Sequence, residues 1–178
     1  MKQKITTRQM VLTAVFIALG VIIPWAFHSV PNAWTFLPMH LPALVAGLLL
    51  GPVSGLLTGA FSVVLSGLIT GMPPVAKWLV MIPELASYGL FAGLFQRLFK
   101  KDYVGTLISL VLAMLAGRVV YALMKFIEVQ VVAGVKPFTF QAFIAGAFAM
   151  VIAGIIMLVV IVPPIVLMLR KLLENNNR

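Results

Sequence analysis

The sequence has 178 residues, of which 62% are hydrophobic and only 10% are charged, and its mean hydropathy is +1.14. These values exclude an ordinary soluble domain and are typical of a membrane protein with several spans. The sequence contains no cysteine, which excludes disulfides, thiolate metal sites and cysteine nucleophiles. Because no polar stretch is long enough to form a second domain, we interpret residues 1–178 as a single transmembrane domain.

The net charge of +9 comes from basic residues that gather where apolar stretches begin or end. Three such clusters are Lys2, Lys4 and Arg8; Arg97, Lys100 and Lys101; and Arg170, Lys171 and Arg178. The enrichment of lysine and arginine in cytoplasmic loops explains this distribution. No basic tract is interleaved with aromatic residues, so the charge does not indicate nucleic-acid binding.

Proline, glycine and charged residues divide the chain into six apolar spans, which predict an all-α bundle of six transmembrane helices. The predicted spans are 9–27, 37–50, 52–70, 78–95, 104–127 and 139–169. The basic N-terminal segment runs into the first span without a cleavage pattern, so we interpret that span as a retained helix. The second span is short, and Pro163-Pro164 is expected to kink the sixth or end its regular part.

This order of spans places the three basic clusters on one side of the membrane, which predicts that both termini are cytoplasmic. The opposite side receives the longer segments 28–36, 71–77 and 128–138, whereas the Gly51-Pro52 turn on the inner side is very tight. Elaborate outer segments suggest that a ligand is captured from outside. The alternative is that Trp34 and Trp78 are only interfacial anchors.

Small residues recur at steps of four or eight in two spans. The first contains Ala14 and Ala18, and the third contains Gly51, Gly55, Gly59, Gly67 and Gly71. Lipid tails give helices no hydrophobic drive to associate, so small residues must supply the close approach. We therefore predict that the third span lies in the crowded centre of the bundle, with its hydroxyl side chains free to bond back to their own helix.

Arg118 lies well inside the fifth span, where a charge costs about 2.5–3.5 kcal/mol on insertion scales. Arg118, Tyr121, Lys125 and Glu128 are three or four residues apart, which places them within about 80° of one another around a helix. We predict a single polar stripe, in which Lys125 and Glu128 reach the outer surface.

Glu84 lies near the outer start of the fourth span, with Tyr88 one turn deeper, and is expected at a depth similar to that of Arg118. Two interpretations stay open. Glu84 and Arg118 form a buried ion pair, or Arg118 is the cationic floor of an outward-opening cavity that takes a substrate carboxylate. His40 is either a packing histidine or a ligand contact. The candidate substrate-binding residues are Glu84, Tyr88, Arg118, Tyr121, Lys125, His40, Trp34, Asn32 and Trp78.

Motifs of catalysis are missing from the sequence. It has no GxxxxGK[ST] loop, so we do not expect it to hydrolyse ATP itself. It has no HExxH motif, and two histidines with four acidic residues make a transition-metal site unexpected. No serine lies in a recognisable nucleophile motif. The sequence therefore predicts a protein that is not an enzyme and needs no cofactor.

Three local patterns carry a family resemblance: TAVFIALG at 13–20, FLPMHLPALVAGLLLGPVSG at 36–55, and SGLITGMPP at 66–74. With its length, six spans and basic N-terminus, the sequence resembles the substrate-binding S component of energy-coupling factor (ECF) vitamin transporters over nearly the whole chain. The resemblance implies a multi-pass protein of a prokaryotic plasma membrane that binds a micronutrient from outside. It also implies a membrane scaffold subunit and two cytoplasmic ATPases as partners.

S components carry an Ala-x-x-x-Ala motif that docks on the scaffold subunit, so the resemblance gives Ala14 and Ala18 that role. Family members bind substrate among the outer loops and the outer halves of the later helices, where Glu84, Arg118 and the rest of the stripe are expected. Two cationic residues there favour an acidic vitamin, with pantothenate and nicotinate as the leading candidates. Pyridoxine or a hydroxymethylpyrimidine would instead use Glu84 and the aromatic residues.

Other function classes make different demands. A self-sufficient secondary transporter would use Glu84 and Arg118 as a proton-coupled pair. A membrane enzyme or assembly factor would need a catalytic constellation that the sequence does not contain.

Overall fold

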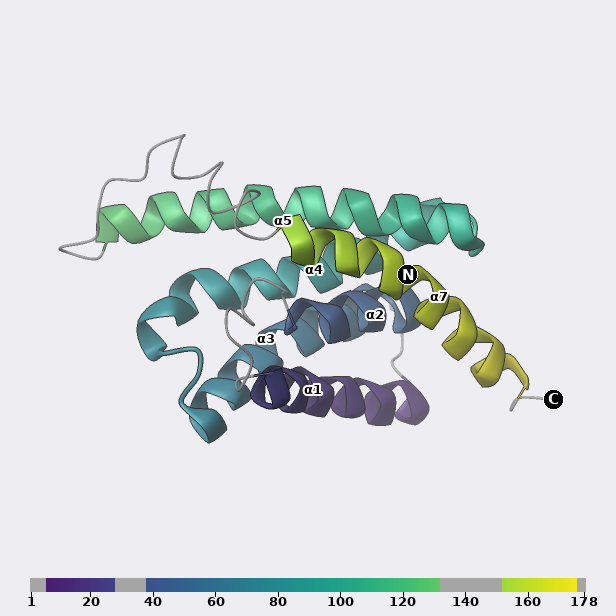
Figure 1. Cartoon of the computed structure of the whole chain (residues 1–178), viewed down its shortest axis with the longest axis horizontal. Helices are drawn as coiled ribbons and strands as arrows, with labels where there is room; N and C mark the ends of the chain where they lie inside the picture. Colours follow the sequence, from purple (N-terminus) through teal and green to yellow (C-terminus); the bar gives the residue numbers. More distant parts are fainter. Residues whose placement is uncertain (1–5, 28–37, 132–151, 176–178) are drawn as a thin grey trace.

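The computed structural model describes residues 6–27, 38–131 and 152–175, which form six α-helices and one short 3-10 helix (Figure 1). The elements are α1 (Thr7–Phe27), α2 (His40–Leu50), α3 (Pro52–Thr70), η2 (Val75–Lys77), α4 (Trp78–Leu98), α5 (Tyr103–Val131) and α7 (Ile152–Asn175). A chain this apolar has to satisfy its backbone groups within each segment, which in lipid favours helices. The predicted all-α fold is confirmed.

Five of the helices are long and apolar enough to cross a membrane: α1, α3, α4 together with η2, α5, and α7. They make the chain a multi-pass membrane protein. α2 has 11 residues, about 16 Å at 1.5 Å per residue, so it is shorter than the hydrocarbon core of about 30 Å. Five of the six predicted crossings therefore have a helix of sufficient length, and crossing by α2 stays a prediction.

The sixth predicted span is described only from residue 152 onward. α7 continues to Asn175, past the predicted end at residue 169, and Pro163 and Pro164 both lie inside it. The expectation that the proline pair could end the regular helix is wrong. The axis of α7 bends along its length (Figure 1), as expected where two prolines remove backbone donors.

α2 is the most enclosed helix of the bundle. All of its residues except Leu41 and Leu49 are buried, and it packs against α1, α3, α4, α5 and α7. A helix that is apolar on every side, as HLPALVAGLLL is, belongs in an interior. The prediction that the third span occupies the crowded centre is therefore right for only one face of α3, because its other face exposes Phe61, Leu65 and Leu68.

Four glycines bring α2, α3 and α4 together backbone to backbone. A Cβ atom on Gly89 would lie 2.1 Å from the carbonyl oxygen of Gly55, and one on Gly47 would lie 2.2 Å from the carbonyl oxygen of Gly89. One turn along α3, a Cβ on Gly59 would lie 2.2 Å from the carbonyl oxygen of Leu85. The predicted close approach along the third span is confirmed at Gly55 and Gly59, whereas a Cβ atom on Gly71 would meet open space.

Hydroxyl side chains of α3 bond back to their own helix, as predicted. Thr58 Oγ1 donates to the carbonyl oxygen of Ser54 at 2.8 Å, and Thr70 Oγ1 donates to that of Ser66 at 2.7 Å. These bonds satisfy hydroxyl groups that the packed interface would otherwise leave without partners. They therefore serve packing rather than a polar path.

Members of all three basic clusters lie at one end of the bundle, toward the right in Figure 1. Arg8 Nη2 donates to the carbonyl oxygen of Leu173 at 3.3 Å. Arg170 donates to the carbonyl oxygens of Lys101 at 2.7 Å and Leu48 at 3.2 Å. The beginning of α1, the turn between α4 and α5, and the end of α7 are therefore on the same side. The starts of α2 and α4 lie at the opposite end, where the polar residues of α5 meet them.

Candidate functional site

A buried ion pair joins α4 to α5. Arg118 Nη1 donates to Glu84 Oε1 at 3.2 Å, and the two residues are 6% and 5% exposed. α4 and α5 run in opposite directions, so a residue six positions into α4 meets one in the second half of α5. The ion pair that the sequence left as one of two interpretations is therefore present in the structure.

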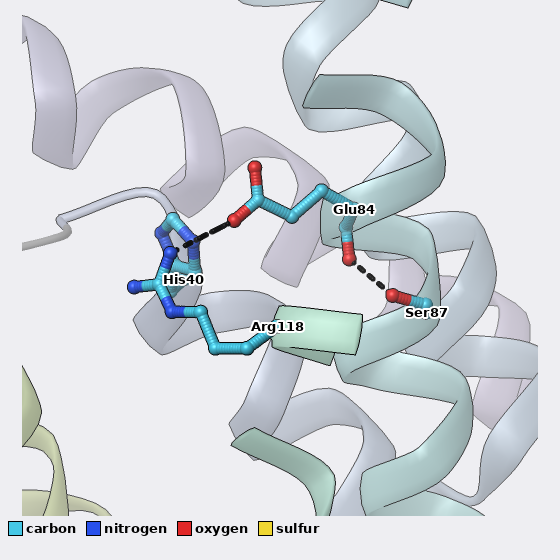
Figure 2. Close-up of polar contacts among 4 residues, drawn as sticks. All are labelled: His40, Glu84, Ser87 and Arg118. Carbon is cyan, nitrogen blue, oxygen red and sulfur yellow. Dashed lines mark hydrogen bonds and ion pairs between the residues drawn. The ribbon is translucent and has the colours of Figure 1, made fainter. Parts of the chain in front are cut away.

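A third helix brings His40 to the same carboxylate. His40 is the first residue of α2 and is 7% exposed, and its Nε2 lies 3.8 Å from Glu84 Oε1. In Figure 2 the guanidinium of Arg118 and the imidazole of His40 approach the Glu84 carboxylate from the same side. One carboxylate oxygen is thus the meeting point of α2, α4 and α5. We call His40, Glu84 and Arg118 the charged cluster.

Two tyrosines flank the guanidinium of Arg118. Its Cζ atom lies 5.8 Å from the ring centre of Tyr88 and 5.9 Å from that of Tyr121. Contacts at this distance stabilise a cation over an aromatic face. The Tyr88 ring also meets the His40 ring edge-on, with centroids 4.9 Å apart. Tyr88 is therefore a wall shared by both basic members of the charged cluster.

The local sequence explains how this wall is held. Tyr88 is 1% exposed and lies one turn after Glu84 on the same face of α4. Its ring packs against Gly117, where a Cβ atom would lie 2.4 Å from Tyr88 Cε1. The Ser87 hydroxyl donates to the backbone carbonyl of Glu84 at 2.6 Å (Figure 2). Gly117 thus leaves room for Tyr88, and the buried Ser87 hydroxyl has its acceptor at the backbone of Glu84.

Several buried polar atoms of the charged cluster are without a hydrogen bond. Among the described residues, Arg118 Nη2 and both ring nitrogens of His40 have no hydrogen-bond partner. Unpaired buried donors are costly, and in native proteins they often mark a place where something else binds. Arg118 therefore keeps binding capacity that its contact with Glu84 does not use.

The outer part of the predicted stripe on α5 forms a second ion pair. Lys125 Nζ donates to Glu128 Oε2 at 2.6 Å. The Lys125 side chain is 32% exposed, whereas that of Glu128 is 9% exposed. The expectation that Glu128 reaches the outer surface is wrong, since α5 continues to Val131 and the Glu128 carboxylate turns back to Lys125.

The remaining predicted residues have different surroundings. Trp78 Nε1 donates to the carbonyl oxygen of Pro73 at 2.9 Å, and its ring packs against Gly67. Its indole N–H is therefore used within the chain. Asn32 and Trp34 lie outside the described residues. Ala14 and Ala18 lie on the exposed side of α1, away from the buried face formed by Thr13, Phe16 and Gly20.

Sequence reasoning did not identify Ser87 or Gly117 as part of the site. The signal for Gly117 was its position directly before a buried arginine on an otherwise bulky apolar helix. Ser87 lies three residues after Glu84, a spacing at which a hydroxyl can bond the preceding turn. Both residues support the site without offering a group to a ligand.

The chemistry available at this site is anion recognition and proton exchange. Within the described ranges, no group of three or more His, Cys, Asp or Glu side chains could hold a metal ion. A surface depression of about 450 Å³ on α7 is lined by Met168, Lys171, Leu172 and Asn175, none of which belongs to the charged cluster. Arginine, histidine, glutamate and two tyrosines in an apolar bundle are suited to binding a small polar molecule.

The fold and site together define a multi-pass membrane protein with a buried polar cluster between its helices. A comparison with protein-family models matches residues 8–170 to the family described as ECF transporter, substrate-specific component. No curated protein and no solved structure gives a match. Because the match covers most of the sequence, the chain belongs to this family. It is therefore a substrate-binding subunit for uptake that works with an ECF module, and ATP hydrolysis takes place in partner subunits.

Proposed function

We propose that this chain takes up a small carboxylate-bearing vitamin, with pantothenate and nicotinate as the leading candidates. The observation that carries the proposal is the buried guanidinium of Arg118, whose Nη2 is without a partner among the described residues. Guanidinium groups bind carboxylates through two parallel hydrogen bonds when both are available. A substrate carboxylate would use Nη2 as well as Nη1.

The contact between Arg118 and Glu84 supports an exchangeable pair. Its N–O distance is 3.2 Å, whereas charge-assisted bonds of this kind are commonly about 2.7–2.9 Å. The contact involves one nitrogen and one oxygen, so a bidentate carboxylate would make a stronger interaction. Tyr88 and Tyr121 would then border the bound acid, and the ion pair between Lys125 and Glu128 would lie farther along α5.

The subunit would bind its vitamin at the end of the bundle opposite the basic clusters, which we assign to the outside of a prokaryotic plasma membrane. Both termini would then be cytoplasmic. The exposed pair Ala14 and Ala18 on α1 would dock on the membrane scaffold subunit, because small residues allow close approach of another helix. Two cytoplasmic ATPases would complete the transporter.

The experiment that tests the substrate class begins with mass spectrometry of small molecules retained on the purified chain. Nicotinate and pantothenate are then titrated beside their neutral analogues nicotinamide and panthenol. We expect at least one acid to bind, and its neutral analogue to bind much more weakly. A retained vitamin without an acidic group would overturn the substrate assignment.

Replacing Arg118 with Ala tests the residue that carries the proposal. We expect R118A to weaken carboxylate binding by about 2 kcal/mol or more, about 30-fold in Kd. Lys171→Ala, at an exposed position on α7, is the matched control and should bind like the wild type. Unchanged affinity in a folded R118A variant would assign Arg118 to structure alone.

A reconstitution experiment separates this proposal from a self-sufficient secondary transporter. Proteoliposomes that contain only this chain should bind the vitamin without accumulating it. Accumulation driven by a proton gradient would contradict the dependence on an ECF module.

A further inference from the structure

His40 is the one residue of the charged cluster that has no role in carboxylate binding by Arg118. Its Nε2 lies 3.8 Å from the same Glu84 oxygen that Arg118 contacts at 3.2 Å. Neither ring nitrogen of His40 has a hydrogen-bond partner among the described residues. A histidine that only packs would be expected to have its polar atoms satisfied.

The charge of the cluster has to stay balanced, because its three residues are only 5–7% exposed. With neutral His40, the negative Glu84 and positive Arg118 sum to zero. A bound substrate carboxylate adds one negative charge, and an uncompensated buried charge costs several kcal/mol. Anion binding therefore calls for one additional positive charge close to Glu84.

A proton on His40 is the charge that the surroundings can supply. Imidazole titrates near pH 6.5 in the absence of perturbation, whereas tyrosine titrates at about 10 and arginine above about 12. The groups facing His40 are Glu84 and Tyr88 from α4 and Arg118 from α5, with Tyr121, Lys125 and Glu128 farther out on α5.

The other helices packed on α2 bring no titratable group close to His40. α3 has none along Pro52–Thr70. α1 brings Arg8, and α7 brings Arg170, Lys171 and Glu174. Arg8 contacts Leu173, and Arg170 contacts Leu48, in the last turn of α2. Both contacts are at the other end of the bundle, about 12 Å or more from His40 at 1.5 Å per residue.

We propose that His40 takes up one proton when a substrate carboxylate displaces Glu84 from Arg118. This inference rests on the proposed function. The proton comes from solvent and is held at Nε2, from which it is donated to Glu84 Oε1, and no covalent bond between heavy atoms forms or breaks. Glu84 thus exchanges one cationic partner for another 3.8 Å away. Vitamin and proton bind together, and departure of the vitamin releases the proton.

Calorimetric titration of the whole chain with nicotinate and pantothenate tests this coupling. Each titration is run in phosphate and in Tris, and the difference in heat between the buffers counts the protons taken up. Between about pH 7 and 8.5 both acids are fully ionised, so they do not contribute protons. We expect uptake of about one proton per vitamin bound. The affinity should therefore decrease by up to about tenfold for each unit by which the pH is raised.

Two substitutions assign the proton to this cluster. In H40Q we expect weaker binding, little proton uptake and a flat pH dependence, because glutamine can contact Glu84 but cannot be protonated. In E84Q we expect tighter binding, by tenfold or more at the alkaline end, again without proton uptake, because no displaced carboxylate needs a partner. H28Q changes the only other histidine of the chain and should keep the pH dependence of the wild type.

The outcomes separate this inference from the proposed function. Arg118-dependent carboxylate binding without proton uptake in the wild type would overturn the role of His40 alone. Full proton uptake in H40Q would also overturn it, and would move the proton to Glu84. If neither acid binds, both the substrate assignment and the proposed proton uptake by His40 are wrong. The wild-type proton count needs no variant, so a misfolded H40Q does not prevent a decision.

Discussion

The ring of Tyr88 on α4 fits beside Arg118 because Gly117 on α5 has no side chain. A Cβ atom on Gly117 would lie 2.4–2.7 Å from three carbons of the Tyr88 ring. Tyr88 is 1% exposed, so its ring cannot move aside into solvent. Rigid packing of this kind keeps the ring at one distance from the guanidinium.

The first prediction is that Gly117→Ala damages both folding and binding. Overpacking a buried site commonly costs about 1–3 kcal/mol, and a displaced Tyr88 would no longer border Arg118. Thermal unfolding in detergent measures the loss of stability, and titration with the bound vitamin measures the loss of affinity. Val119→Ala, on the exposed face of α5, should change either quantity by less than about 0.5 kcal/mol. Wild-type stability of G117A would contradict the rigid contact.

For single residues, the sequence predicts how far along the bundle a side chain lies better than it predicts which neighbouring helix that side chain faces. Span order and helical rise place Glu84 and Arg118 at similar depth, and the structure joins them at 3.2 Å. The rotation of each helix about its axis depends on packing between segments distant in the sequence. For that reason the approach of His40 to the same oxygen, and the inward turn of Glu128, could not be predicted.

Among the helices, the crossing of α2, α3 and α4 depends on glycine at three positions. Backbone carbonyl oxygens occupy the space that a side chain on Gly47, Gly55 or Gly89 would need. Backbone atoms cannot change rotamer, so a methyl group at this crossing would have to push whole helices apart. α2 and α4 carry His40 and Glu84 one to two turns beyond this crossing, so the crossing also sets the geometry of the charged cluster.

The second prediction is that Gly89→Ala destabilises the bundle and weakens vitamin binding together. We expect a loss of about 1–3 kcal/mol or more in unfolding free energy. Thermal unfolding and vitamin titration on the same sample measure the two effects. Leu94→Ala on the same helix, at a position 38% exposed, is the matched control. A G89A variant that keeps its stability would show that α3 and α4 can separate at little cost.

At the element scale, the sequence predicted most helices but misjudged which one lies in the centre. Long apolar runs bounded by charge and proline correspond to α1, α3, α4 and α5 within a few residues. The regular small-residue repeat of α3 predicts a central position, whereas α2 is uniformly apolar and has no such repeat. Burial on every side follows from such composition. The residues that enclose α2 come from five other helices, so a local sequence pattern cannot identify them.

For the whole molecule, contacts at one end already constrain membrane topology. Arg8 contacts Leu173, and Arg170 contacts Lys101, so three segments distant in sequence share a side. Positive residues favour the cytoplasm. The exposed Lys77 lies at the other end, at the start of α4.

The third prediction concerns this topology and uses the absence of native cysteine. Single cysteines introduced as Lys101→Cys and Lys171→Cys should react with a membrane-impermeant maleimide only after the membrane is opened. Lys77→Cys should react in intact cells. The measurement is the labelled fraction of each variant before and after permeabilisation. Labelling of K101C in intact cells would place the basic end outside and reverse the proposed direction of uptake.

The fourth prediction is that α1 carries the docking surface for the scaffold subunit. Ala14 and Ala18 face away from the bundle, and the charged cluster includes no residue from α1. We therefore expect substrate binding and docking to use separate parts of the molecule. Ala14→Phe or Ala18→Phe should leave vitamin affinity within about twofold while reducing recovery of the complete ECF complex about tenfold or more, because a bulky ring prevents close helix approach. Co-purification with the scaffold subunit and vitamin titration of the isolated chain measure the two effects. Leu65→Phe, at an exposed position on α3, controls for added bulk in lipid. Equal loss of vitamin binding would indicate that α1 supports the fold, whereas normal complex recovery would move the docking surface to another helix.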